Sequence, residues 1–249
     1  MVTEKFVMQT ELVASEDGRH TYEVKRSWSD TGRKGLVLEL YPTLSAERCG
    51  ELDLSTMHLL NHTKDLGWAS VRIVNLYSLV CTGKPKVSEL SYDEKNIAYI
   101  EEILESKDIA DYDIVIATGN SLSTHTKTLE TKIDILSMLR EKKLEKQVKY
   151  IAAESADKEK WVGVHPLFLG LHYGRDIWRL ETFPLEDELK ALEESIKPKA
   201  TGKKSEKAVV PDGKEVVQDV AADAEMGEKK NTGKKGGGKA NVSKDKKQA

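Results

Sequence analysis

The sequence predicts an α/β domain with a three-layer α/β/α architecture, in which helices cover both faces of a mainly parallel central sheet. Short apolar runs of strand length alternate along the chain with longer segments in which apolar residues recur at helical spacing. The strand-length runs are continuously apolar, which is typical of strands that are buried on both faces. Such strands separated by helices favour parallel pairing, since the helices provide the crossover connections.

The first half of the predicted domain contains three strands and one helix. Residues 21–28 alternate enough for a strand, and residues 35–41 form a buried strand with a proline directly behind it. Residues 52–66 repeat leucine and threonine at helical spacing and are followed by a glycine, a frequent residue just after a helix. Residues 69–77 form the second buried strand.

The second half continues the alternation of helix and strand. Ser91 and Glu94 have the spacing of a capping box, and the helix behind them carries isoleucines on one face. Residues 112–117 form the third buried strand, and residues 123–143 form a helix with a leucine and isoleucine face. The remaining predicted elements are a strand at 148–153, an irregular stretch around Trp161 and His165, a strand at 177–182 and a helix at 185–196.

Charge and composition divide the chain into three parts. Residues 1–20 form an N-terminal arm or an edge strand, residues 21–196 form the α/β domain, and residues 197–249 form a disordered Lys/Gly-rich tail. The tail holds 14 lysines against 8 acidic residues, whereas the whole chain holds 39 basic and 42 acidic residues, so the rest carries 25 basic against 34 acidic. This balance excludes a uniformly basic nucleic-acid binder. The tail either contacts polyanions weakly or only keeps the protein soluble.

The expected location is the cytoplasm. The first residues lack the apolar stretch of a secretory signal, and no apolar window approaches the length of a membrane span. We therefore expect a protein of the reducing cytoplasm without a membrane partner.

Polar and aromatic residues follow the buried strands at the ends where ligands bind in parallel α/β sheets. These strand ends are Tyr41-Pro42, Asn75-Leu76-Tyr77, Thr118-Gly119-Asn120 and the loop after Ala153. We therefore expect a ligand site at this edge of the sheet.

The same strand ends carry an ordered set of motifs. They are Tyr41-Pro42-Thr43, Asp53 with Ser55 and Thr56, Gly67-Trp68, Val74-Asn75-Leu76-Tyr77, Ala117-Thr118-Gly119 and His165-Pro166-Leu167-Phe168. In this order, over about residues 20–180, they resemble the domain-of-unknown-function family 1643. The layout is more distantly similar to the uracil-DNA glycosylase superfamily, which implies a fold of that type and an N-glycosylase-type hydrolase.

The superfamily resemblance implies roles for two of these motifs. One motif after the first core strand positions or activates water, and Tyr41-Pro42 stands at its place, with tyrosine where the superfamily has Asn or Asp. A late His-Pro motif stabilises charge on the departing base, and His165-Pro166 stands at that place.

Two residues are catalytic candidates. His165 could donate a hydrogen bond from a neutral imidazole to an oxygen that gains charge, or it could be a loop histidine bonded to the backbone. Asp53 could act as a general base toward water, or it could be the N-cap of the following helix. Both roles of Asp53 are possible together only if one carboxylate oxygen remains free.

The ligand-binding candidates lie at the strand ends. Asn75 could read a base edge with its amide or tie neighbouring loops together. Tyr41 and Tyr77 could stack on a planar ligand or form the rim of the core. The full set of base- or ligand-binding candidates is Tyr41, Pro42, Thr43, Asn75, Tyr77, Gly119 and Asn120.

No metal and no other cofactor is expected. His58 and His62 lie four residues apart on one helix, a spacing that can bind zinc, but a fourth ligand is not evident, although Asp53 or Asp65 could be proposed. The glycine pattern of a dinucleotide site and the Gly-Lys-Ser/Thr of a P-loop are both missing.

Two functions remain open from the sequence. The first is an enzyme that acts on a base in DNA or in a nucleotide, with the base placed in the pocket at the strand ends. The second is a non-catalytic module that binds a nucleic acid or a protein on the same fold.

Overall fold

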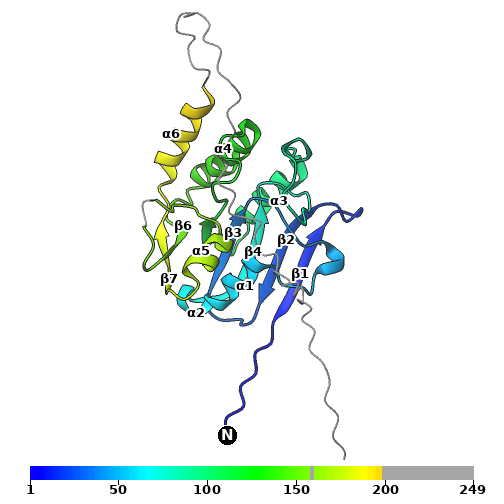
Figure 1. Ribbon diagram of the computed structural model, residues 1–249, viewed down its shortest axis with the longest axis vertical. Coiled ribbons are helices and arrows are strands. Elements are labelled where there is room, and N and C mark those ends of the chain that lie inside the picture. The colour runs from blue at the N-terminus through cyan, green and yellow to red at the C-terminus, as the bar shows by residue number, and fades with distance from the viewer. Residues whose placement is uncertain (158–159, 198–249) are drawn as a thin grey trace, which may run out of the picture.

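The computed structural model describes residues 1–157 and 160–197, and a seven-stranded sheet forms its centre (Figure 1). The predicted disordered tail, except for Lys197, lies outside the described residues. The strand order is β1-β2-β4-β3-β5-β6-β7. The strands are β1 (Gln9–Ala14), β2 (Thr21–Ser27), β3 (Arg33–Glu39), β4 (Trp68–Asn75), β5 (Tyr112–Ile116), β6 (Val148–Ala153) and β7 (Trp178–Thr182).

The sheet is mixed, and this corrects the prediction of a mainly parallel one. The pairs β3–β4, β3–β5 and β5–β6 are parallel, so the four central strands run in one direction. The pairs β1–β2, β2–β4 and β6–β7 are antiparallel. The continuous apolar runs indicated burial on both faces correctly for the central strands. They could not indicate the direction of the flanking strands, because direction depends on how each connection returns the chain to the sheet.

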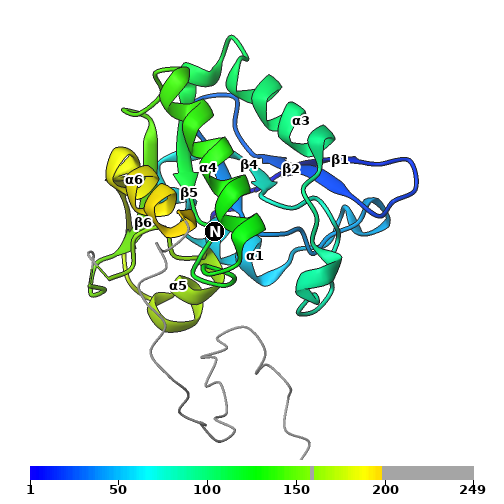
Figure 2. The same ribbon diagram turned by 90° about the horizontal axis from the view of Figure 1, so that it is seen from above.

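Helices pack on both faces of the sheet. Leu36 and Leu38 point to one face, where buried residues of α3 (Glu94–Leu104), α4 (Thr126–Glu141) and α6 (Leu185–Ile196) surround them. Val37 points to the opposite face, which α1 (Leu54–Asn61), α2 (Thr63–Leu66) and α5 (Pro166–Tyr173) cover. Figure 2 shows α3 and α4 on one side of the strands and α1 and α5 on the other.

Local chemistry explains where several helices begin and end. The predicted helix at 52–66 is divided at His62 into α1 and α2, and Gly67 adopts the left-handed conformation (φ 69°) at its end, as the sequence predicts. Asp93 rather than Ser91 caps α3, since its carboxylate accepts a hydrogen bond from the amide of Lys95. Helix α5 lies in the stretch around His165 that was predicted to be irregular, and this corrects that prediction.

The arm and the connecting segments complete the domain. The alternative of an edge strand for residues 1–20 is confirmed by β1, which pairs with β2. Short 3₁₀ helices are formed by Ala46–Arg48, Val87–Glu89 and Ile109–Asp111. Among the helices of the described residues, none combines the length and apolar character that a membrane crossing requires.

A buried polar network connects β2, β4 and α3. The Glu23 side chain is 5% exposed, and its carboxylate accepts hydrogen bonds from the Arg72 guanidinium, one of them at 3.0 Å, and from the Tyr99 hydroxyl at 2.6 Å. Burial first, and then the Glu23 carboxylate, raises the pKa of Tyr99, so its hydroxyl remains a donor. In this network the Glu23 carboxylate, the Arg72 guanidinium and the Tyr99 hydroxyl form hydrogen bonds with one another in place of those that water would provide.

We predict that Glu23→Gln destabilises the domain, because it leaves the Arg72 guanidinium buried without its counter-charge. The expected loss is about 3–5 kcal/mol in the free energy of unfolding, measured by urea denaturation. Glu11→Gln is the matched control, since Glu11 is 64% exposed and pairs with Lys25 at 3.5 Å. Its expected loss is at most about 1 kcal/mol. Equal losses in the two variants would contradict this description of the network.

Candidate functional site

Two polar residues end neighbouring parallel strands at the carboxyl edge of the sheet. Glu39 ends β3, Asn75 ends β4, and the two are direct partners in the β3–β4 register. Partners in register project to the same face, here the face that α1 and α5 cover, because Glu39 lies two residues after Val37. The residues are 6% and 2% exposed, respectively. The β3–β4 pairing therefore places a carboxylate and an amide side by side under two helices.

Both side chains have an oxygen without a hydrogen-bond partner. The Oε1 atom of Glu39 and the Oδ1 atom of Asn75 are buried and make no hydrogen bond with any of the described residues. A buried acceptor without a partner costs about 1–3 kcal/mol, so such atoms normally face a bound water or a ligand. The edge thus offers two acceptors to a donor group from outside the chain.

His165 completes the cluster from the opposite direction. It is the N-cap residue of α5, and its Nδ1 atom accepts a hydrogen bond from the amide of Leu167 at 3.2 Å. Its Nε2 atom lies 3.5 Å from Oε2 of Glu39. An accepting Nδ1 assigns the hydrogen of the neutral imidazole to Nε2, where it points at the carboxylate. His165 is therefore hydrogen-bonded to the backbone through Nδ1, and at the same time its Nε2 atom faces the carboxylate of Glu39.

Two carboxylates oppose the effect of burial on the pKa of His165. Burial alone would lower the pKa of His165, but the Glu39 carboxylate and, more weakly, the Asp53 carboxylate outweigh it and raise the pKa above its ordinary value. The side chain is still 26% exposed, so a ligand or water can reach it. The Glu39–His165 pair is therefore an accessible imidazole on a buried carboxylate.

Gly119 allows the loop after β5 to pack directly on His165. Its φ is 66°, and a Cβ atom at this position would lie 3.2 Å from the Cβ of His165. The amide of Gly119 donates to the carbonyl of Gly163 at 3.0 Å, which fixes the approach. The predicted ligand-binding residue Gly119 is thus in contact with the predicted catalytic residue His165.

Asp53 is a helix cap. Its Oδ1 atom accepts the amide hydrogen of Thr56 at 2.7 Å, and its Oδ2 atom accepts the hydroxyl hydrogen of Thr43 at 2.9 Å. Each carboxylate oxygen accepts one of these hydrogen bonds and has a further lone pair, so the role of Asp53 as general base stays a prediction, whereas its role as cap is shown. The cause is local: the first turn of α1 needs an acceptor for its amides, and Asp53 is the residue at the N-cap. Thr43 positions this cap.

The other predicted residues divide between core and rim. Tyr41 is half-buried against the core on the α4 face, and burial raises the pKa of its hydroxyl. Pro42 is buried and accepts the amide hydrogen of Cys81 at 2.9 Å. Tyr77 is fully buried, with its hydroxyl 2.7 Å from that of Thr128, so it offers no ring face for stacking and that expectation is corrected. Asn120 is exposed at the mouth of a cavity that Gly119 also lines.

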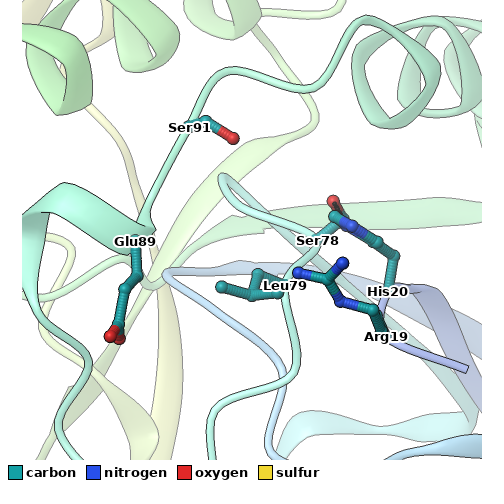
Figure 3. Close-up of a pocket in the computed structure, with 6 residues that line it drawn as sticks. All are labelled: Arg19, His20, Ser78, Leu79, Glu89 and Ser91. Atoms are coloured by element: carbon teal, nitrogen blue, oxygen red, sulfur yellow. Dashed lines mark hydrogen bonds between the residues drawn. The ribbon is translucent and has the colours of Figure 1, made fainter.

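A separate cavity of about 380 Å³ lies beyond the end of β4 and contains a serine–histidine pair (Figure 3). Nδ1 of His20 lies 2.8 Å from Oγ of Ser78, and that hydroxyl donates to the carboxylate of Asp93. Because Asp93 takes the hydroxyl hydrogen, His20 does not act as a base toward Ser78. The trio anchors the start of β2 to the N-terminus of α3 and is not a nucleophile arrangement.

Sequence reasoning missed Glu39, the central residue of the cluster. The signal is a single carboxylate inside the apolar run 35–41, two residues before Tyr41 of the Tyr41-Pro42 turn. A charged residue in a strand buried on both faces needs a partner, so this position predicts a paired carboxylate. Within the described residues, no group of three histidine, cysteine or carboxylate side chains is placed to hold a metal ion.

Comparisons with known proteins identify the family. The model of the family described as "Protein of unknown function (DUF1643)" matches residues 21–167, and the chain belongs to this family. No curated protein matches the chain. Carboxyl esterase 2 (TmelEST2) from the mycorrhizal fungus Tuber melanosporum is a structural match with 14% sequence identity and a TM-score of 0.28. It covers 53% of this chain and 43% of the esterase chain, and likeness at this level supports neither a shared fold nor a shared activity. The resemblance to uracil-DNA glycosylases stays a prediction.

We predict that Glu39→Gln lowers the pKa of His165, since burial then acts without the opposing carboxylate. The measurement is an NMR titration of the imidazole nitrogens in wild type and variant, with Glu51→Gln, an exposed carboxylate outside the cluster, as the control. A raised folded-state pKa stabilises the wild type below the ordinary histidine pKa of about 6.5, and this stability is lost as pH rises through the folded value. An unchanged pKa in Glu39→Gln would contradict the pairing.

Proposed function

We propose that the protein binds a nucleobase at the carboxyl ends of β3 and β4 and hydrolyses the N-glycosidic bond that joins the base to its sugar, in DNA or in a nucleotide. The single observation that carries this proposal is the Glu39–His165 pair beside the unpartnered oxygens of Glu39 and Asn75. Hydrolysis of this bond needs a base for water and a donor for the leaving group, and the pair supplies one of each.

Asn75 gives the site its preference for a heterocycle with an N–H group. Its buried Oδ1 atom accepts one hydrogen bond from a ring or exocyclic N–H, and its amide nitrogen is a donor for a neighbouring carbonyl. The backbone of Asn75 is anchored, since the side chain of Asn96 donates to its main-chain carbonyl at 2.9 Å. Such a donor and acceptor pair reads one edge of a base.

The hydrolytic step assigns one role to each member of the pair. Glu39 accepts a proton from water while the water oxygen bonds to the anomeric carbon. The C–N bond breaks with its electron pair moving to the base, and Nε2–H of His165 donates to the base oxygen on which charge develops. The proton held by Glu39 then passes to the base nitrogen, so one water is consumed and free base and free sugar hydroxyl result. Water activation falls to Glu39 in place of Asp53, whose two oxygens each already accept a hydrogen bond.

A non-catalytic binding module is the second candidate, and one observation favours it. Glu39 is only 6% exposed, so its carboxylate reaches water only when the edge of the site opens. The module would use the same acceptors of Glu39 and Asn75 to hold a base without breaking any bond.

Base release by the full chain separates the two candidates. Single- and double-stranded oligonucleotides that carry uracil or other modified bases, together with free nucleotides, serve as substrates. Alkali-induced strand breaks and chromatography of the released base provide the readout. We expect release by wild type and a rate lower by about 10²–10⁴-fold in Glu39→Gln and His165→Ala. His172→Ala, on the exposed side of the same helix, is the matched control for His165→Ala.

Two results would overturn parts of this assignment. If the protein retains a base-containing ligand but never releases the base, the binding module replaces the enzyme. If Asp53→Asn, which keeps an oxygen acceptor for the helix cap, loses as much activity as Glu39→Gln, water activation belongs to Asp53 and not to Glu39.

A further inference from the structure

A second cavity lies on the other side of Gly119, against the N-terminal half of α4. Its volume is about 170 Å³, roughly ten times the ~15 Å³ that a single water requires. Gly119 lines it and also contacts His165, so the cavity and the Glu39–His165 pair adjoin the same loop. A ligand that occupies both places would lie across the carboxyl edge of the sheet.

The lining of this cavity is rich in hydroxyl groups and contains one amine. The hydroxyl-bearing residues are Thr118, Ser121, Ser123 and Thr128, and the amine is that of Lys132. Thr118 is 4% exposed and lies two residues after Ile116, so its side chain points to the α4 face. Its hydroxyl forms no hydrogen bond with another of the residues that the structure describes. The residue is nearly fully buried but its hydroxyl oxygen remains accessible, so the hydroxyl is available to a ligand in the cavity.

Lys132 has a counter-charge but no hydrogen bond. Its Nζ atom lies 3.8 Å from Oε2 of Glu188, which is longer than a hydrogen bond, and no hydrogen bond links it to the rest of the described residues. The Lys132 side chain is 19% exposed, and burial lowers its pKa, with Glu188 acting in the opposite direction. The Lys132 ammonium group therefore has hydrogens available to a ligand in the cavity, whose other polar side chains are the four hydroxyl groups, Asn120 and Glu188.

The start of α4 adds to the positive character of the cavity. Thr128 and Leu129 of its first turn belong to the lining, and the side chain of the N-cap residue His125 makes no hydrogen bond to the helix backbone. The amides of the first turn of this 16-residue helix are then available to an anion. Glu188 is the one carboxylate of the lining, and an anion at Lys132 would have to displace it.

We infer that this cavity binds the phosphate group of a nucleotide, with Lys132 as the counter-charge and the hydroxyls of Thr118 and Ser121 as hydrogen-bond donors. The identification of the ligand as a nucleotide rests on the proposed function, since the base would occupy the Glu39–Asn75 position on the other side of Gly119. Glu188 holds Lys132 in the absence of the ligand and releases it when phosphate enters.

Ribose 5-phosphate tests this inference without any contribution from a base. Calorimetric titration of the full chain with ribose 5-phosphate, inorganic phosphate and ribose gives the affinities. We expect the two phosphates to bind and ribose alone to fail. Lys132→Met should weaken binding about tenfold or more, and Glu188→Gln should strengthen it, because it removes the competing carboxylate. Lys146→Met, at an exposed lysine beyond the C-terminal end of α4, is the control and should leave the affinities unchanged.

Three outcomes would overturn the inference. They are failure of wild type to bind either phosphate, equal binding by Lys132→Met, and binding of ribose as strong as that of ribose 5-phosphate. If Lys132→Met does not fold, Glu188→Gln still decides the question. A Lys132–Glu188 ion pair with a structural role alone would give no gain in phosphate affinity when Glu188 is replaced. Phosphate binding that depends on Lys132, without any base release, would support the phosphate site and contradict the proposed hydrolysis. Base release without phosphate binding would support the hydrolysis and contradict the phosphate site.

Discussion

The parallel pairing of β3 with β4 on one side and β5 on the other is the constraint on which the site depends. Register alone makes Glu39 and Asn75 neighbours, and the same pairing brings the loop with Gly119 to the end of β3. A shift of one residue would turn Glu39 and Asn75 to opposite faces, because side chains alternate along a strand. The apolar positions around them, Val37 and Ile73 among others, hold the register by their burial.

Two buried oxygen atoms at this edge lack hydrogen-bond partners within the described part of the chain, and a ligand could supply them. The backbone groups of the sheet and the helices form hydrogen bonds with one another, whereas Oε1 of Glu39 and Oδ1 of Asn75 can still each accept a hydrogen bond. His165 joins structure and chemistry in one side chain, since Nδ1 caps α5 and Nε2 faces the carboxylate. A helix N-terminus therefore fixes the orientation of the imidazole before any ligand arrives, which is the preorganisation that catalysis or tight binding requires.

Much of the fold could be predicted from the sequence, because burial on both faces produces long apolar runs. The central strands and the polar strand ends follow from that pattern. The direction of the flanking strands depends on connections that periodicity does not describe, and α5 was missed because its apolar residues are crowded around a proline and a glycine. The sequence around Asp53 fits both a helix cap and a general base. Its role as cap becomes visible only from the hydrogen bonds that its carboxylate accepts from Thr56 and Thr43. Glu39 was missed because the apolar run around it predicts a strand and conceals the one charge within it.

The measurement that tests the central claim most directly follows the side-chain amide of Asn75 by ¹H–¹⁵N NMR while free nucleobases are added. We predict that at least one base shifts the Asn75 amide and the His165 imidazole resonances together and saturably. We also predict that Glu39→Gln weakens this binding. If no base moves the Asn75 resonances, or if Glu39→Gln binds as well as wild type, the carboxyl edge of β3 and β4 is not a nucleobase site.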